Sequence, residues 1–265
     1  MICPICGSTG KQIFQGEIMQ KYKVQYYQCS LCGFLYTEKP YWIKEAYEDS
    51  ITNVDTGIMQ RTVDNVLVAN ILIQNFFDKA AKFLDYGGGY GIFTRMMRDL
   101  GYNWLWYDKY SENLVARGFE YEENDKIELI SAFELFEHFE NPIEELKHLF
   151  SISKSILFST LIYDDDLQYK SFEEWWYYVP ETGQHISFYS KRTLEYIANK
   201  FNVNYYMLND GMHLFTGNRI NPIKLKMMTA SKIGRKMQYH KYNEQRKNGL
   251  AYNDMQAILE MRKGK

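Results

Sequence analysis

All four cysteines of this 265-residue chain lie within its first 32 residues, as the pairs Cys3-Pro-Ile-Cys6 and Cys29-Ser-Leu-Cys32. A glycine follows each pair, and glycine readily adopts the positive φ with which a chain leaves a tight turn. Two thiolates on such a turn can both bind one tetrahedral Zn²⁺. The spacing therefore predicts one zinc site formed by Cys3, Cys6, Cys29 and Cys32, with a disulfide pair or a redox motif as the alternative.

The predicted zinc site is structural in character. Four thiolates complete a tetrahedral coordination sphere and leave no position for a reacting water. The stretch between the two pairs, Ile13 to Tyr27, is strand-like, so the pattern indicates a zinc-ribbon-like module over residues 1–36. A metal ion lets so short a segment hold a fold that its own apolar core could not sustain.

The composition is that of a folded protein, with 46% apolar residues and a length that suits one large domain plus a small appendage. No apolar run approaches the roughly 18 residues that cross a bilayer, and the best one, 66–77, is interrupted by asparagine and glutamine. The first residues lack the basic and then apolar regions of a secretion signal. We therefore expect a cytoplasmic protein without a membrane span.

Charge is divided unevenly along the chain. Residues 221–265 contain eleven basic and three acidic side chains, a net charge of +8, although the whole chain has a net charge of only −2. This tail also has apolar residues at helical spacing, so we expect a helix that packs on the body or meets a partner. The near-neutral total argues against nucleic acid as a partner without excluding it.

Strand-like and helix-like segments alternate after a connector over residues 37–56. The expected strands are residues 82–86, 103–107, 127–133, 155–160, 203–208 and 213–217, and the expected helices are 57–77, 91–100, 142–150 and 191–200. This alternation predicts an α/β domain over residues 57–220, with a parallel sheet covered on both faces by helices. Residues 163–189 interrupt it with an acidic and then aromatic stretch, which we interpret as a lid or substrate wall.

The first of these strands runs into a glycine-rich loop, Tyr86-Gly87-Gly88-Gly89-Tyr90-Gly91, and then a helix. Glycines let the backbone approach a ligand closely at the carboxyl end of a strand, where open α/β sheets bind nucleotides. Ile92 stands where the dinucleotide-binding fingerprint needs its third glycine, and no Gly-Lys-Ser/Thr follows as in a phosphate-binding loop.

Asp108 ends the second expected strand, and its carboxylate can accept both hydroxyls of a ribose. The alternative is that Asp108 caps the next helix. An acid before the glycines, Asp85, together with an acid after the second strand, Asp108, distinguishes a cofactor loop from an ordinary tight turn.

From about Gly57 to Asn218 the chain resembles the class I S-adenosylmethionine-dependent methyltransferases. Residues 85–91 look like the first motif of that family, and Asp108 looks like its ribose-binding acid. Residues 132–142, which contain a Glu-His pair, are similar to the family's fourth-strand segment.

A narrower resemblance lies in residues 178–189, which contain Gly183-Gln184-His185. This segment looks like one in bacterial methyltransferases of sugar and surface-polysaccharide biosynthesis. Some relatives, among them deoxysugar C-methyltransferases, also carry an N-terminal zinc-binding module. The stretch between Asp108 and Ile127 departs from the family, because it is short for a full third strand with an adenine-contacting acid.

The resemblance implies a Rossmann-like, mostly parallel sheet of seven strands with helices on both faces, followed by the helical basic tail at 221–265. It implies S-adenosylmethionine as the cofactor, with its amino-acid part at the glycine loop and its ribose at Asp108. Ala132 and Phe133 would form the floor beneath the methyl donor. The full set of implied cofactor-binding residues is Asp85, Tyr86, Gly87, Gly88, Gly89, Asp108, Ala132 and Phe133.

Methyl transfer to a hydroxyl or an acidic C–H also needs a base, and two histidines are candidates. His185 comes first, because it lies in the segment expected to cover the acceptor and imidazole titrates near neutral pH. His138, after the fourth strand, comes second, and a structural hydrogen-bonding role is the alternative for each. The aromatic run Trp175–Tyr178 either stacks on a sugar or packs. The acidic run Asp164–Asp166 is expected to be solvated, with no catalytic metal.

These features predict an enzyme, an S-adenosylmethionine-dependent methyltransferase that O-methylates a sugar, a sugar nucleotide or a polysaccharide precursor. One alternative is C-methylation of a keto-deoxysugar, with His185 removing an α-proton. Another is RNA methylation or RNA binding through the zinc-ribbon-like module and the basic tail. A third alternative is a catalytically inactive scaffold, and the intact cofactor-loop residues argue against it: Asp85, Gly87, Gly89 and Asp108. The sequence does not name the acceptor or the oligomeric state.

Overall fold

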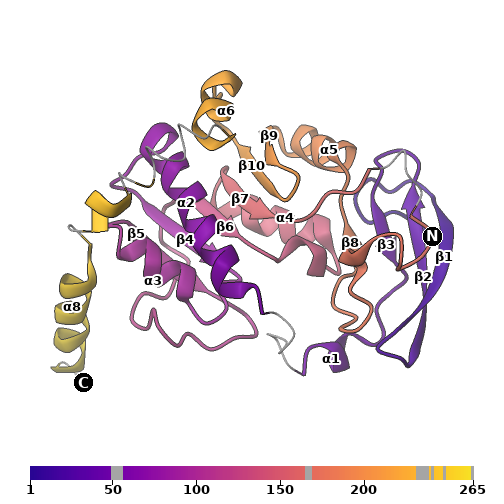
Figure 1. Cartoon of the computed structure of the whole chain (residues 1–265), viewed down its shortest axis with the longest axis horizontal. Helices are drawn as coiled ribbons and strands as arrows, with labels where there is room; N and C mark the ends of the chain where they lie inside the picture. Colours follow the sequence, from indigo (N-terminus) through magenta and orange to yellow (C-terminus); the bar gives the residue numbers. More distant parts are fainter. Residues whose placement is uncertain (49–55, 165–168, 231–238, 240–241, 247–248, 264–265) are drawn as a thin grey trace. The chain divides into compact units, whose positions relative to one another are not determined.

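The computed structural model describes residues 1–48, 56–164, 169–230, 239, 242–246 and 249–263. The chain forms two compact units, each built from two separate stretches (Figure 1). Unit 1 consists of Met1–Thr52 and Phe133–Asn218, and unit 2 consists of Asn53–Ala132 and Arg219–Lys265. Each unit therefore combines two stretches that are far apart in the sequence.

Some of the expected features lie outside the described residues. They include most of the second half of the connector, two of the three acids in the run at 164–166, and parts of the basic tail; the positions are 49–55, 165–168, 231–238, 240–241, 247–248 and 264–265.

Unit 2 contains a parallel sheet in the order β5-β4-β6, formed by β4 (Lys82–Tyr86), β5 (Asn103–Tyr107) and β6 (Ile127–Ala132). The middles of these strands are apolar and buried, as expected of parallel strands covered by helices. Asp85 lies in register with Trp106 on one side and Ser131 on the other. The buried polar residues of this sheet, Asp85 and Ser131, therefore lie side by side near the carboxyl ends of their strands.

The helices of unit 2 are α2 (Ile58–Phe76), α3 (Ile92–Arg98), α6 (Pro222–Ala230) and α8 (Ala251–Lys263). α2 contacts both α3 and α6, and α3 contacts β5. α3 begins directly after Gly91, which has a φ of 84° and so turns the chain from the glycine loop into the helix.

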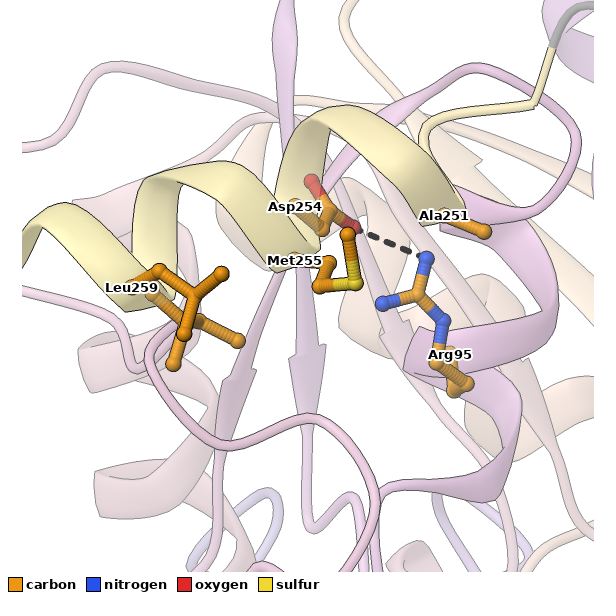
Figure 2. Close-up of a pocket in the computed structure, with 6 residues that line it drawn as sticks. Arg95, Ala251, Asp254, Met255 and Leu259 are labelled. Atoms are coloured by element: carbon orange, nitrogen blue, oxygen red, sulfur yellow. Dashed lines mark ion pairs between the residues drawn. The ribbon is translucent and has the colours of Figure 1, made fainter.

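The end of the predicted basic tail is part of unit 2. Asp254 of α8 forms ion pairs with Arg95 and Arg98 of α3. Figure 2 shows the pair with Arg95 beside a pocket lined by Arg95, Ala251, Asp254, Met255, Ile258 and Leu259. Just before α8, a side chain at Gly249 would place its Cβ 2.3 Å from the backbone oxygen of Asp99. The tail thus reaches the body at a position where only glycine fits.

In unit 1, β10 (Met212–Thr216) pairs antiparallel with β7 (Ile156–Ser159) and with β9 (Asn204–Asn209). The helices of this part are α4 (Pro142–Ile152) and α5 (Lys191–Phe201). α4 has its proline in the first turn, where a missing N–H costs nothing. α5 begins with a capping box in which Ser190 and Thr193 satisfy each other's backbone N–H groups.

A second sheet in unit 1 has the order β1-β2-β3-β8, with all pairs antiparallel (Figure 1). Its strands are β1 (Gly10–Ile18), β2 (Tyr22–Cys29), β3 (Leu35–Thr37) and β8 (Ser187–Phe188), and the short helix α1 (Ile43–Ala46) follows β3. β8 comes from the end of the predicted lid. The Trp42 indole also donates a 2.8 Å hydrogen bond to the carbonyl of Gly183. The lid segment is therefore packed into the sheet of the cysteine module.

The predicted α/β class is confirmed, but the sheet differs in detail. Apart from the strands of the β1-β2-β3-β8 sheet, the described residues contain six strands, where the resemblance implied seven. β4, β5 and β6 pair in parallel, and β7, β9 and β10 pair antiparallel. Residues 109–126 form turns and one isolated bridge between Glu120 and Trp106, because this stretch is short and rich in charged residues. None of the described helices is long and apolar enough to cross a membrane.

Candidate functional site

The glycine loop turns sharply at the carboxyl end of β4. Gly87, Gly89 and Gly91 have φ angles of 77°, 52° and 84°, which other residues adopt only with strain. The backbone N–H groups of Gly87 and Gly88 both donate to the carbonyl of Tyr107, at 2.8 and 3.0 Å. The loop therefore closes over the end of β5 as well.

Gly88 is required for a different reason. A Cβ there would lie 2.6 Å from Trp106 Cδ1 and 2.8 Å from Asp85 Oδ2, so the space beside it is filled by the protein itself. Tyr86, before the loop, is half-buried, with its ring 4.8 Å from that of Tyr107. Close packing beneath the loop thus leaves its glycine backbone as the surface that a ligand could approach.

Asp108 ties the loop to the segment that follows β5. Its Oδ2 accepts a 2.9 Å hydrogen bond from the N–H of Gly89, and its Oδ1 accepts from the N–H groups of Tyr110 and Ser111, both at 2.7 Å. The two bonds to Oδ1 are like those that a helix-capping aspartate accepts, which was the alternative role of Asp108, but no helix begins at this point among the described residues. A carboxylate offers about four acceptor sites, so Oδ2 retains one for a hydroxyl.

Asp85 lies buried beneath the loop. Its two oxygens accept hydrogen bonds from Ser131 Oγ at 2.8 Å and from Thr94 Oγ1 at 3.0 Å. Burial raises the pKa of the Asp85 carboxyl to about 7, while the two hydroxyl donors act in the opposite direction. Sequence reasoning missed Ser131 and Thr94, because neither belongs to the loop motif.

The two residues expected at the floor of the cofactor site follow Ser131. Ala132 is fully buried at the end of β6, and Phe133 is half-buried. Ala132 ends the first stretch of unit 2, and Phe133 begins the second stretch of unit 1.

The two candidate bases lie together in unit 1, with ring centroids 5.1 Å apart and planes at 87°. His138 belongs to the 3₁₀ turn η1 (Phe136–His138), and its Nδ1 is 3.2 Å from the carbonyl oxygen of Gln184. His185 Nδ1 is 2.7 Å from the carbonyl oxygen of Tyr177. Because a carbonyl only accepts, each Nδ1 carries the proton and each Nε2 keeps its lone pair.

Both imidazoles are neutral at ordinary pH. Each ring keeps some solvent exposure, yet burial lowers the pKa of His138 to about 3 and that of His185 to about 4. The charge of the other histidine acts in the same direction on His138.

Glu137 joins the two histidines and was not singled out from the sequence. The ligand atoms of Glu137, His138 and His185 all lie within 4.8 Å of one another. The Glu137 side chain is fully buried and accepts a 2.6 Å hydrogen bond from the hydroxyl of Tyr177. Its place directly before His138 was the available signal.

The aromatic run at 175–178 separates into two roles. Trp175, Tyr177 and Tyr178 are buried in the aromatic core of unit 1, so the packing interpretation fits these three. Trp176, at the start of the 3₁₀ turn η2 (Trp176–Tyr178), is 71% exposed.

The four cysteines form one cluster. Sγ of Cys3 is 3.6 Å from Sγ of Cys32, and Sγ of Cys6 is 3.4 Å from Sγ of Cys29. All four cysteines are free in this structure. A tetrahedral zinc site with bonds of about 2.3 Å places its sulfurs about 3.8 Å apart, so this cluster could hold a zinc ion.

A family of proteins described as a methyltransferase domain matches residues 59–207. The chain belongs to this methyltransferase family. The predicted enzyme class is thereby confirmed. The match takes in the glycine loop, Asp108 and both histidines, and it leaves the cysteine module and α8 outside.

Comparison with solved structures finds this methyltransferase similar to several others. They include the plantazolicin methyltransferase BpumL in complex with SAH (15% identity, 68% of this chain and 95% of that chain, TM-score 0.47) and an O-methyltransferase family protein from Burkholderia thailandensis (13%, 68% and 65%, 0.45). Magnesium protoporphyrin IX methyltransferase from Synechocystis PCC 6803, with bound SAM, is a third (16%, 65% and 87%, 0.40). Comparison with curated protein sequences gives no match.

Proposed function

We propose that this methyltransferase uses S-adenosylmethionine to O-methylate a sugar, a sugar nucleotide or a polysaccharide precursor in the cytoplasm. The observation that carries the acceptor chemistry is His185, a neutral imidazole whose Nδ1–H is fixed on the carbonyl of Tyr177 and whose Nε2 keeps its lone pair. That nitrogen can accept the proton of a hydroxyl as the hydroxyl oxygen attacks a methyl group.

The cofactor would bind at the glycine loop of unit 2. When bound there, S-adenosylmethionine supplies an electrophilic methyl group on a sulfonium. Gly87 and Gly89 present backbone without side chains, and Asp108 Oδ2 has an acceptor site for one ribose hydroxyl. Asp85 acts from below, because its hydrogen bonds to Ser131 and Thr94 fix the end of β4 on which the loop rests.

His185 suits the role of base better than His138 does. Its pKa, at about 4, is higher than the value of about 3 for His138, so it binds a proton more strongly. Its shorter bond to a carbonyl, 2.7 against 3.2 Å, also stabilises the positive charge that the ring gains with the proton. In this proposal His138, whose ring packs edge-on against that of His185, orients either the His185 ring or the acceptor.

A zinc ion at the four cysteines completes the proposal. It would be structural, since the four sulfurs fill its coordination sphere. The end of the basic tail is joined to the rest of unit 2, because Asp254 of α8 forms ion pairs with Arg95 and Arg98.

The cofactor half of the proposal is tested by calorimetry with S-adenosylhomocysteine on the purified chain. The Asp108→Ala variant loses a charged acceptor, and its affinity should fall about 10- to 100-fold, which corresponds to 1.5–3 kcal/mol. Glu112→Ala, which removes an exposed acid of the same segment, is the matched control and should bind as the wild type does. Absence of binding to the wild type would overturn the proposal.

The acceptor half is tested with ¹³C-methyl-labelled cofactor and a panel of nucleoside diphosphate sugars. The expected product carries the label on oxygen, which carbon NMR distinguishes from a label on carbon. A C-methylated keto-sugar would instead favour the C-methyltransferase alternative. Methylation of RNA, with no sugar in the panel accepted, would contradict the proposed substrate class.

A further inference from the structure

Glu137, His138 and His185 have the composition of a metal site. Two imidazoles and one carboxylate place their ligand atoms within 4.8 Å of one another, a spacing that one ion at bonds of about 2.1 Å could bridge after small side-chain movements. The three residues come from two separate segments of unit 1, η1 and the stretch before β8. The cluster is therefore made by the fold and not by a local sequence motif alone.

The surroundings of the cluster orient its members as metal ligands are usually oriented. Each histidine gives its Nδ1–H to a backbone carbonyl, which leaves Nε2 as the coordinating nitrogen. Tyr177 orients two of the three ligands, because its carbonyl accepts from His185 and its hydroxyl donates to Glu137. Hydrogen bonds to both the imidazole and the carboxylate ligands are the common outer shell of protein metal sites.

The electrostatics of the cluster favour a cation. Glu137 is fully buried, and a carboxylate removed from water is stabilised when it meets a positive charge.

We propose that Glu137, His138 and His185 bind a divalent transition metal ion such as Zn²⁺ or Co²⁺, as a second metal site besides the four cysteines. The donor set of two imidazoles and one carboxylate suits these ions and leaves coordination positions open. The sequence predicted no catalytic metal, because the acidic run at 164–166 was expected to be solvated and methyl transfer from a sulfonium does not require a divalent ion.

The consequence for the enzyme rests on the proposed function. An ion at this cluster would occupy the lone pair that His185 would use as a base. The metal-free form would take the proton of an acceptor hydroxyl on this imidazole, whereas the metal-loaded form would supply a Lewis acid in its place.

The test is the metal content of the full chain after equilibration with Zn²⁺ and removal of free ions, measured by elemental mass spectrometry. We expect two ions per chain in the wild type and one in both Glu137→Gln and His138→Gln. Glu140→Gln, an exposed acid close by in the chain, is the matched control and should keep two. One ion in the wild type, or two in both cluster variants, would overturn the proposal.

A second measurement uses the wild type alone, so that it remains valid if a cluster variant folds poorly. Co²⁺ bound by imidazole and carboxylate lacks the thiolate charge-transfer absorption of the cysteine site, so titration of the wild type with Co²⁺ should show two spectroscopically distinct steps. A single step with thiolate absorption alone would count against the second site. Calorimetry with S-adenosylhomocysteine on the same samples separates the outcomes, because its failure concerns the proposed function and leaves the ion count untouched.

Discussion

Arg98 donates two hydrogen bonds to Asp254, from Nε to Oδ2 at 2.8 Å and from Nη2 to Oδ1 at 2.7 Å. Both side chains are buried, and the guanidinium also lies 3.6 Å from the ring of Phe119. Arg98 ends α3, the helix that follows the glycine loop, whereas Asp254 lies on α8. The last described helix is thus joined to the helix that starts at the candidate cofactor site.

We expect Asp254→Ala to destabilise the protein strongly. Removing one partner leaves a buried guanidinium without its counter-charge, which costs about 3–5 kcal/mol. Denaturant unfolding measures the change. Asp99→Ala breaks the other ion pair of Arg95 at a position that is 44% exposed, and it should cost less than about 1 kcal/mol. Equal losses of unfolding free energy in Asp254→Ala and Asp99→Ala would contradict the larger contribution expected from the buried ion pairs of Asp254.

Gly88→Ala should disturb the loop although Gly88 has an ordinary φ. The new Cβ would meet Trp106 at 2.6 Å, so the indole or the loop must move, at a cost of about 1–3 kcal/mol. The expected result is a lower melting temperature and weaker binding of S-adenosylhomocysteine. Gly211→Ala is the control, since its Cβ would have its nearest neighbour at 3.8 Å. Wild-type affinity in Gly88→Ala would argue against a cofactor site at this loop.

The buried histidines should make the fold sensitive to acid. His185 has a folded-state pKa of about 4, below the value near 6.5 of an unfolded chain, so the unfolded state binds more protons between these pH values. The free energy of unfolding should therefore fall as the pH drops from about 6.5 to 4, by at most about 1.4 kcal/mol per pH unit for one group. Asp85, with its pKa raised to about 7, contributes in the opposite direction.

Comparison of variants isolates the histidine contribution. His185→Gln should show a shallower decline of unfolding free energy with acid than the wild type, because it no longer has this imidazole to protonate. His148→Gln, at an exposed position on α4, is the matched control for loss of an imidazole. An unchanged slope in His185→Gln would contradict the burial of a neutral ring.

Chelation of the zinc ion proposed at the four cysteines should affect unit 1 selectively. Without the ion the β1-β2-β3-β8 sheet loses its anchor, and Trp42 and Trp175, both buried in the adjoining core, should become exposed. The expected signals are a red shift of tryptophan fluorescence and loss of methyl transfer, with binding of S-adenosylhomocysteine retained. Readdition of Zn²⁺ should restore both signals. A chelated protein with unchanged fluorescence would mean that the cysteines hold no ion needed for the fold.

Features written in short stretches of sequence could be predicted from it. The cysteine spacing, the glycine loop and Asp108 are local patterns, and their residues lie together as expected for the cysteines and for the loop. The pairing of Asp85 with Ser131 could not be predicted, because it joins neighbouring strands across 46 positions and depends on their register. The same holds for Arg98 and Asp254, 156 positions apart.

Burial also changed what the local patterns meant. Three aromatic residues of the run at 175–178 are buried in the core of unit 1. Hydrophobic periodicity could not predict this burial, because these residues belong to a 3₁₀ turn and the residue before it, not to a long helix or strand. Glu137 directly precedes His138 in the sequence, but only the fold places both residues beside His185.

The pairing of β3 with β8 has a consequence for the synthesis of the protein. Leu35 meets Phe188 and Tyr36 meets Ser187, so the sheet that the cysteines anchor is completed by a strand made about 150 residues later. At about 5–20 residues per second, β3 waits on the order of ten to thirty seconds for its partner. During that interval β3 presents an open strand edge, a surface with which strands of other chains can pair.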